Sequence, residues 1–507
     1  MKHIFLIIFI LITLQPFAQT GAQIKKIGLM VAPGTLGANA VTLLWDKQPG
    51  VTTYTVFLNG KNRGSSTKTN ITVENLKPST QYSAVLYTHS KNKKRKSSSL
   101  NFKTPATGKI FNIIDFGAKT NPGFMNTKAI QSAINACTDG GIVYIPKGTF
   151  VSGALYLKSN MTLFIEQGAV LQGSDNPVEY LPMIKNRFEG WEMDTYASLL
   201  NAGKLSRDGL CNVKNLRING GGTIRGGGKK LGDAQRAANG IRNRGRLILL
   251  MNCRDVSISN LTITDPPAWT IHYIYSNNIT CSNLHIITKG IHNGDGIDPD
   301  SSTDSYIFNC TFDTGDDCIA IKSGKNPEGF YVAKPTKNVR VTDCNFVNGH
   351  GISIGSEMSG GVSDVLVQDC KAGKLLHGMQ IKATRDRGGY VRNVVVEDCQ
   401  LLKITIFSTV NYNNDGTPAP LPPIFENFVF RNIDLSAAST KEPVININGF
   451  KDPGHLLTNV LFQNILLPKD ARVEINDAKN ILFKNVKTMN GDHPQIDKQN
   501  AIDILVL

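Results

Sequence analysis

A degenerate repeat constrains the fold of this chain more than any other feature of its sequence. Segments such as SISNLTI, TCSNLHI, VTDCNF and LFQNILL share β-branched alternation around a polar or Cys residue, and intervals of 21 to 34 residues separate successive copies. Units this short cannot bury a hydrophobic face alone, so they must stack on one another. The shared position falls at Asn260, Asn283, Cys310, Cys344, Cys370, Cys399, Asn432, Asn464 and Asn485.

Stacking of such units predicts an all-β fold, a right-handed parallel β-helix in which equivalent residues of successive coils lie about 4.8 Å apart. The Asn and Cys column is then a ladder, with amides bonded along the stack and Cys as a small buried residue. The segment from Asn126 to Cys137 has helical spacing behind an Asn cap, and we expect it to close one end of the solenoid. The nine cysteines include no CxxC pair, so we expect neither a zinc site nor any other cofactor.

A different pattern precedes the repeats. Residues 24–104 contain short strands with turn signals, including Asn59-Gly60, and predict a small β-sandwich with Trp45 in its core. The stretch LKPSTQY, Leu76 to Tyr82, resembles the tyrosine corner of fibronectin type III domains. We therefore predict a sandwich over 24–104, a linker over 105–108 and the β-helix over 109–507.

The N-terminus has the pattern of an export signal. Residues 1–22 carry Lys2 and His3, then the apolar run FLIIFILITL, then small residues, as secretory signal peptides do. A signal anchor is the alternative, but the apolar run is short for a membrane span. We expect export to a periplasm or beyond the cell, with no membrane span after removal of the signal.

The net charge of +15 is compatible with an acidic partner such as nucleic acid, anionic lipid or a polyanionic glycan. The basic loop SKNKKRKSSS, Ser90 to Ser99, accounts for part of this charge, and a solvated turn explains it.

Five ionisable residues recur at intervals close to one coil. Asp295 precedes Asp317 by 22 residues, His350 follows one longer coil later, and Lys382 one coil after that. Asp316 adds a third carboxylate, and Gly315 before it permits a bend that presents both aspartates outward. Each residue alone is more often part of a solvated turn. Their shared register instead predicts one patch of acid chemistry on the side of the solenoid.

The motifs around these residues are NGDGIDPDSS, GDDCIAIKSG, GHGISIGS and QIK. In order and spacing they resemble the active-site motifs of the polygalacturonases of glycoside hydrolase family 28, and the resemblance extends over residues 108–507. It implies inverting hydrolysis of α-1,4 links between galacturonic acid units. By motif position Asp316 would be the general acid, and Asp295 and Asp317 would hold and deprotonate water. His350 would keep the acid protonated, and Lys382 would pair with a substrate carboxylate.

One position departs from the family pattern. The usual Arg-Ile-Lys is Gln380-Ile381-Lys382 here, so a neutral amide replaces a bidentate guanidinium. Grip on one substrate carboxylate is then weaker, or nearby Arg385 or Arg387 supplies it. Tyr412 corresponds to a substrate-contacting tyrosine of the family. We also consider Arg246, Trp269 and His272 as possible substrate contacts, with a core position equally compatible for Trp269.

Several functions fit these features. The first is an exo-acting hydrolase of homogalacturonan, with the segment from Arg225 to Arg246 closing one end of the groove. Gln380 leaves rhamnogalacturonan or a decorated pectin open as the substrate. A calcium-dependent pectate lyase and a non-catalytic glycan-binding solenoid are further alternatives. We expect a pectic partner, no nucleic acid and a monomer.

Overall fold

The computed structural model describes residues 22, 24–90, 93–410, 412 and 415–507 of the chain. The predicted signal peptide lies outside this part except for Ala22. Within the described ranges, no helix combines the length and the apolar character of a membrane-spanning segment.

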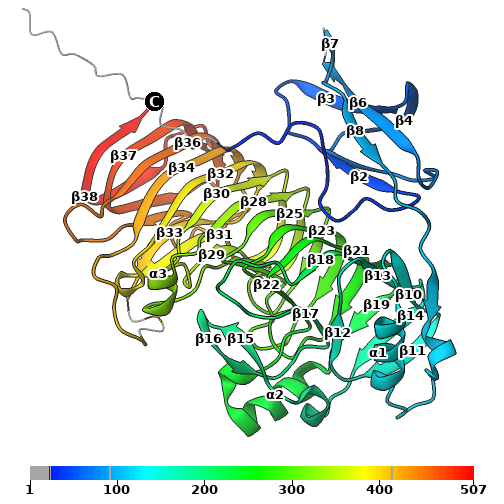
Figure 1. The fold of residues 1–507 in the computed structure, drawn as a ribbon. Helices are drawn as coiled ribbons and strands as arrows, with labels where there is room; N and C mark the ends of the chain where they lie inside the picture. Colours follow the sequence, from blue (N-terminus) through cyan, green and yellow to red (C-terminus); the bar gives the residue numbers. More distant parts are fainter. Residues whose placement is uncertain (1–21, 23, 91–92, 411, 413–414) are drawn as a thin grey trace, which may run out of the picture.

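Two antiparallel sheets form the N-terminal module (Figure 1). One has the strand order β1-β2-β5, and the other has the order β4-β3-β6-β7 with β8 paired to β6. Alternation along β3 turns Tyr54, Val56 and Leu58 inward, where they pack with Trp45 in a shared core. The strands are β1 (Met30–Val31), β2 (Val41–Leu44), β3 (Val51–Leu58), β4 (Lys61–Ser66), β5 (Asn70–Val73), β6 (Gln81–Ser90), β7 (Lys93–Lys96) and β8 (Leu100–Lys103).

The remaining chain winds into the predicted parallel β-helix (Figure 1). Its parallel strands are β9 (Ile110–Asn112), β10 (Gly141–Ile145), β11 (Gly148–Ser152), β12 (Leu155–Leu157), β13 (Met161–Ile165), β14 (Ala169–Gly173), β17 (Leu200–Gly203), β18 (Val213–Gly220), β19 (Thr223–Arg225), β20 (Ile248–Met251), β21 (Cys253–Thr264), β22 (Ile271–Ile274), β23 (Asn277–Ile287), β24 (Ile297–Asp300), β25 (Thr303–Phe308), β26 (Thr311–Asp313), β27 (Ile319–Ile321), β28 (Thr336–Thr342), β29 (Asn345–Ile354), β30 (Val362–Gln368), β31 (Lys371–Thr384), β32 (Tyr390–Gln400), β33 (Ile404–Thr409), β34 (Ile424–Asp434), β35 (Ile445–Asn448), β36 (Leu457–Leu467), β37 (Arg472–Thr488) and β38 (Gln495–Val506).

Other elements lie at the end and along the side of the coils. The antiparallel hairpin β15 (Ile184–Phe188) and β16 (Trp191–Thr195) projects from the solenoid. The helices are α1 (Thr127–Ala136), α2 (Gly228–Asn239) and α3 (Glu328–Val332), with short 3-10 turns η1 (Ile113–Phe116), η2 (Pro177–Tyr180), η3 (Ile241–Asn243) and η4 (Arg385–Arg387).

Helix α1 is the predicted cap of the solenoid, and it buries Ile130 and Ile134 against the first coils. Its preceding residue, Asn126, makes no side-chain capping bond, contrary to expectation. The Asn126 amide instead accepts a bond from Lys119 N and donates to the Phe124 carbonyl, because it is buried in the loop before the helix.

The predicted ladder exists, but the cysteines are not its members. The residues before these cysteines take the left-handed conformation shared by the column. The φ angle lies between 51° and 56° at all its members, which are Asn260, Asn283, Asn309, Asp343, Asp369, Asp398, Asn432, Asn464 and Asn485. That conformation favours Asn and Asp over Cys, which turns inward one residue later and packs in the core. Amides bond along the stack, as from Asn464 to Asn432 at 2.9 Å.

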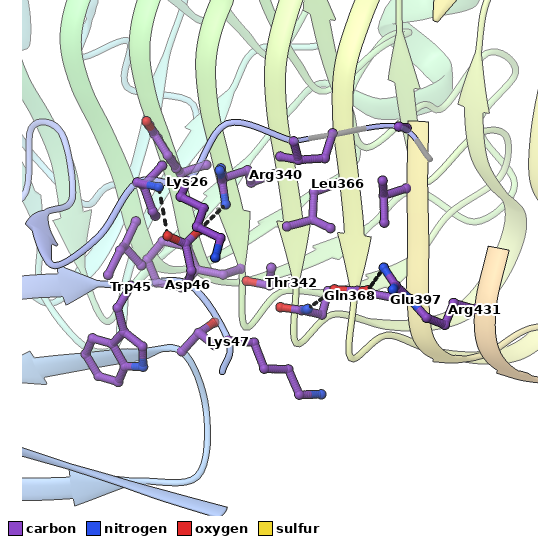
Figure 2. Close-up of a pocket in the computed structure, with 18 residues that line it drawn as sticks. Lys26, Trp45, Asp46, Lys47, Arg340, Thr342, Leu366, Gln368, Glu397 and Arg431 are labelled. Carbon is purple, nitrogen blue, oxygen red and sulfur yellow. Dashed lines mark hydrogen bonds and ion pairs between the residues drawn. The ribbon is translucent and has the colours of Figure 1, made fainter. Parts of the chain in front are cut away.

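The N-terminal module docks on the side of the β-helix where this ladder runs. The Lys47 ammonium lies between Asp369, at 2.6 Å, and Asp398, at 2.7 Å, on neighbouring coils. Asp46 pairs with Arg340 at 3.0 Å. Figure 2 shows these two side chains facing each other at the junction. A cavity of about 220 Å³ remains at this junction.

Candidate active site

Five side chains occupy one column on the groove face of the β-helix. The parallel register aligns Ile271, Ile297, Ile319, Ile352 and Met379 on strands β22, β24, β27, β29 and β31. The residues two positions before each of these are Trp269, Asp295, Asp317, His350 and His377. Residues separated widely in sequence therefore become neighbours about 4.8 Å apart along the solenoid.

Asp316 joins this column because the chain bends just before β27. The nitrogen of Gly315 bonds Thr288 Oγ1 at 3.1 Å, and a Cβ on this glycine would come within 2.8 Å of the Thr288 carbonyl. Close backbone packing, rather than a positive φ, thus requires glycine here. Asp316 is left partly exposed and accepts a bond from the Asp317 nitrogen at 2.9 Å.

His350 contacts both adjacent carboxylates. Its Nδ1 lies 3.0 Å from Asp316 Oδ1 and 3.6 Å from Asp317 Oδ1. Hydrogen bonding to these acids raises the pKa of His350 to about 9, so the imidazole carries a proton at neutral pH.

Asp317 is buried but remains ionised. Burial opposes its charge, yet Lys382 at 3.8 Å, His350 and the Ser353 hydroxyl at 2.7 Å together hold the pKa of Asp317 well below its usual range. Ser353 lies in register with Gln380 on the next coil, and these two side chains are 3.5 Å apart.

Asp295 has a second carboxyl neighbour, Asp298 on β24. Burial and the Asp298 charge raise the pKa of Asp295 well above its usual range, and burial raises the pKa of Asp298 to about 7. Among the described residues, no side chain or backbone group forms a hydrogen bond with either oxygen of Asp298. The two raised pKa values mean that this pair of buried acids resists carrying two negative charges, and the two groups titrate as a set.

A cation faces this pair. Lys322 Nζ lies 3.5 Å from Asp295 Oδ2, 3.7 Å from Asp298 Oδ1 and 3.5 Å from Glu357 Oε2. The groove therefore holds two amines, Lys322 and Lys382, among its carboxylates.

The groove at this column encloses about 320 Å³. Glu189 and Trp269 line one end, and Lys382, Phe407 and Tyr412 line the other. Tyr412 is 43% exposed, and Lys382 Nζ lies 5.5 Å from the centroid of its ring. Tyr412 is thus available to a ligand beside Lys382.

The other expected contacts lie elsewhere. Gln380 lines the groove but is only 2% exposed. Arg385 lies outside the described lining because its guanidinium pairs with Asp452 at 3.1 Å. Arg387 is buried and bonds Asn326, so neither arginine replaces the missing guanidinium.

Arg246 and His272 are also buried, and neither is among the described residues that line the groove. The Arg246 guanidinium lies against both Phe188 and Trp269, with its carbon Cζ at 4.1 and 4.4 Å from their ring centroids. Burial lowers the pKa of His272 to about 4, and its Nε2 lies 3.3 Å from Asp300.

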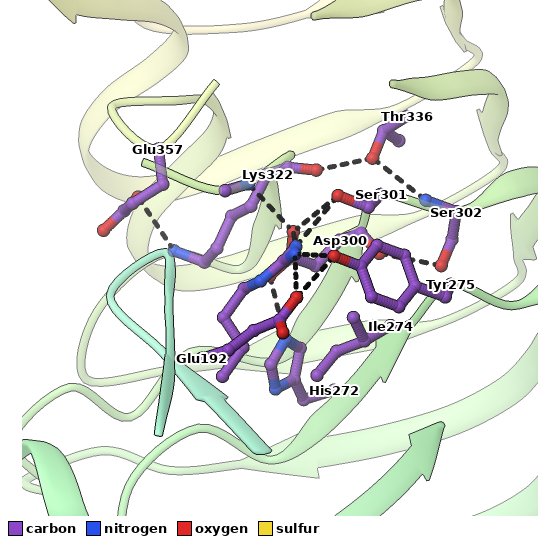
Figure 3. A network of polar contacts seen from close by, with 12 residues as sticks. Glu192, His272, Ile274, Tyr275, Asp300, Ser301, Ser302, Lys322, Thr336 and Glu357 are labelled. Carbon is purple, nitrogen blue, oxygen red and sulfur yellow. Dashed lines mark hydrogen bonds and ion pairs between the residues drawn. The ribbon is translucent and has the colours of Figure 1, made fainter. Parts of the chain in front are cut away.

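Beneath the groove, a polar network anchors hairpin β15–β16 to the coils (Figure 3). Arg187 on β15 reaches Asp300 on β24 at 2.7 Å, and both side chains are fully buried. Tyr275 donates to Glu192 on β16 at 2.6 Å, and Figure 3 shows these two side chains beside Asp300. A hairpin held in this way forms a fixed wall of the groove.

Sequence reasoning missed Asp298, Lys322, Ser353, Glu357 and His377. Most of them stand inside the quoted motifs, and coil spacing relates His377 to His350 in the same way as His350 to Asp317. Extending the register to every polar residue of the four coils would have found them.

Asp316, Asp317 and His350 bring three potential metal-ligand atoms within 4.8 Å of one another. A metal would need the neutral imidazole, whereas the two acids favour the protonated form of His350. Lys382 adds a second positive charge beside Asp317. With these two cations beside its carboxylates, the cluster can take part in proton transfer.

Comparison with known proteins agrees with this chemistry. The model of glycosyl hydrolases family 28 matches residues 188–460. A second model, described as rhamnogalacturonase A/epimerase, pectate lyase-like, matches residues 110–179.

Among relatives, an exo-poly-alpha-D-galacturonosidase of Dickeya chrysanthemi is 30% identical over 76% of this chain and 72% of its own. A probable polygalacturonase of Vitis vinifera is 32% identical over 64% of this chain and 69% of its own. The family 28 exopolygalacturonase structure from Yersinia enterocolitica aligns with a TM-score of 0.84 and 26% identity over 94% of this chain and 98% of that one. The chain belongs to glycosyl hydrolases family 28, and it is a glycoside hydrolase.

Proposed function

We propose that the enzyme hydrolyses α-1,4-galacturonosyl linkages of polygalacturonate with inversion of configuration, acting from a chain end. The observation that carries this proposal is the column of Asp295, Asp317 and His350, with Asp316 beside it and Lys382 one coil further. The three carboxyl groups supply the acid and base of glycoside hydrolysis, and the amine is placed to pair with a uronate.

The proposed roles follow from the contacts. Asp316, the most exposed of the three site aspartates, donates a proton to the leaving oxygen. Asp295 and the ionised Asp317 hold the water and take its proton. The Nδ1 atom of protonated His350 lies 3.0 Å from Asp316 Oδ1, and this contact returns a proton to the acid after each turnover.

Lys382 and Tyr412 would hold the uronate next to the cleaved bond. Lys382 Nζ is positioned between Asp317 and the Tyr412 ring, and 12% of its side chain is exposed. Gln380 acts beneath them through Ser353 rather than by gripping the substrate.

Chain-end action is supported by the wall near Trp269. Arg242 on η3 joins Glu189 at 2.7 Å and also pairs with Asp415. The indole of Trp191 donates to the Asn326 carbonyl at 2.9 Å and faces Arg242. Four separate segments, which contain Trp191, Arg242, Asn326 and Asp415, thereby meet beside the groove. The relatives from Dickeya and Yersinia are named as exo-acting enzymes.

Chromatography of products released from polygalacturonate over time tests this proposal. A monomer or another single short product from the start is expected. A ladder of oligomers would contradict chain-end action, and unsaturated products lost on chelation would establish a lyase.

Rhamnogalacturonan is the second candidate substrate. Gln380 leaves one fewer cation in the groove, and residues 110–179 match a model whose description includes rhamnogalacturonase A. Reducing-end assays on both polymers separate the candidates, and a strict preference for rhamnogalacturonan would contradict the first.

We propose further that residues 24–104 form a fibronectin type III-like module followed by a linker over 105–108. The Lys77 nitrogen donates to the Tyr82 hydroxyl at 2.9 Å, as in a tyrosine corner. Export to a periplasm or beyond the cell, and action as a monomer, complete the proposal. A groove built by one chain supports the latter.

A further inference from the structure

Lys322 is a buried cation to which the proposed mechanism gives no role. Its side chain is only 5% exposed, and its ammonium lies 3.5 to 3.7 Å from the nearest oxygens of Asp295, Asp298 and Glu357. A direct hydrogen bond would be about 2.7–3.2 Å. The ammonium is therefore centred among three acids rather than bonded to one.

The Trp269 ring fixes that central position. Lys322 Nζ lies 4.4 Å from the ring centroid, within range of a cation–π contact. The ring in turn stacks on Phe188 at 4.9 Å. Aromatic packing thus holds the amine at the floor of the groove without any need for contact with a sugar.

The effect of Lys322 depends on the charge that Asp295 and Asp298 carry. Burial raises the pKa of both Asp295 and Asp298, and the charge of Asp298 opposes ionisation of Asp295, so the pair resists carrying two negative charges. Burial without a cation would favour the fully protonated pair, which could not accept another proton.

We propose that Lys322 is a positioning residue whose ammonium keeps one negative charge on the Asp295–Asp298 pair and orients Asp295 toward the catalytic water. This inference rests on the proposed function. In the step it supports, a water O–H bond breaks and its proton passes to Asp295, while the water oxygen bonds the anomeric carbon. The glycosidic C–O bond breaks, and its electron pair stays on the leaving oxygen, which takes the proton of Asp316.

Other charges also face Asp295. Asp298 lies on its own coil and Asp316 and Asp317 on the next, while Arg244 and Arg246 approach from the segment before β20. Glu357 faces Lys322 rather than Asp295. Arg246 from the same segment faces Asp298. Within the described chain, Lys322 is the cation within ion-pair distance of both Asp295 and Asp298.

The test is the acidic limb of the kcat/KM profile, which reports the base of the free enzyme. Lys322→Met should move that limb to higher pH by about one unit or more, so that kcat/KM on the acidic side falls about tenfold. KM at the optimum should change less than about twofold, because the Lys322 side chain is almost fully covered. Lys322→Arg, which keeps the charge, should restore the limb toward the wild-type position.

Asp298→Asn provides a test of opposite sign. It removes the carboxylate that repels charge on Asp295, so the acidic limb should move to lower pH. The variant is nearly isosteric, and it tests the inference even where Lys322→Met fails to fold.

Lys47→Met is the matched control. It also removes an ammonium from between two carboxylates, but on the docking face of the module, and it should leave the limb unmoved. An unmoved limb in folded Lys322→Met, an equal shift in Lys47→Met, or an upward shift in Asp298→Asn would overturn the inference.

A substrate-free readout separates this inference from the proposed function. Infrared difference titration follows the protonated carboxyl bands directly, and Lys322→Met should raise their midpoint relative to the wild type. Failure of the wild type to hydrolyse any pectic polymer would refute the proposed function, whereas an unchanged infrared midpoint would refute the role of Lys322.

Discussion

Replacement of His350 by Gln should destabilise the protein in a pH-dependent way. Hydrogen bonds to Asp316 and Asp317 stabilise the protonated form of His350 and raise its pKa to about 9 from the ordinary 6.5. That shift corresponds to about 3 kcal/mol of stabilisation. Because 33% of the side chain is exposed, solvent screening reduces the expected contribution to about 1–2 kcal/mol.

The sign follows from linkage. The raised pKa means that the folded state binds the proton more tightly than the unfolded state, so the contribution is complete below pH 6.5 and is lost as the pH rises through about 9. Urea unfolding followed by far-ultraviolet circular dichroism measures it. The free-energy difference between wild type and His350→Gln should be about 1–2 kcal/mol larger at pH 6 than at pH 10. Equal differences at the two pH values would refute the reasoning.

Three further substitutions test other parts of the structure. Asp316→Asn should lower kcat by at least about a thousandfold while leaving the circular dichroism spectrum unchanged, since it removes the proposed proton donor but no buried charge; retained activity would contradict its role. Arg187→Met should lower the free energy of unfolding by about 3–5 kcal/mol, because it leaves the buried Asp300 without its ion-pair partner; a loss below about 1 kcal/mol would contradict this. Lys47→Met should cost about 1–2 kcal/mol of unfolding free energy without changing kcat, because its two ion pairs are only partly buried and lie far from the groove; a change in kcat would show coupling between module and groove.

Much of the fold was predictable because each coil of a solenoid repeats the same pattern of residues, so that the repeat is visible in the sequence. Interval and alternation alone indicated the stacked coils, and helical spacing indicated α1. The predicted ladder was one residue out of register at the cysteines, because each Cys was aligned with the Asn of the other coils. The Asn or Asp before each Cys is the residue that corresponds to that Asn. The left-handed turn distinguishes them, because it selects Asp343 and Asp369 over the cysteines that follow.

The site was predictable only where motif and period agreed. Asp295, Asp317 and His350 recur at coil spacing, and the register brings them together. Arg385 was expected in the groove from proximity in sequence, but a partner distant in sequence, Asp452, holds it elsewhere. The role of Lys322 depends on burial and on three distances that no spacing rule supplies.

Inverting hydrolysis of galacturonosyl links by this column of acids determines which anomer is released first. Proton NMR of the first sugar released from polygalacturonate identifies that anomer, because inversion at the α-linkage gives a β-anomer before mutarotation. We expect the β-anomer of a short galacturonide to appear first. Initial release of the α-anomer, or of an unsaturated product, would contradict it.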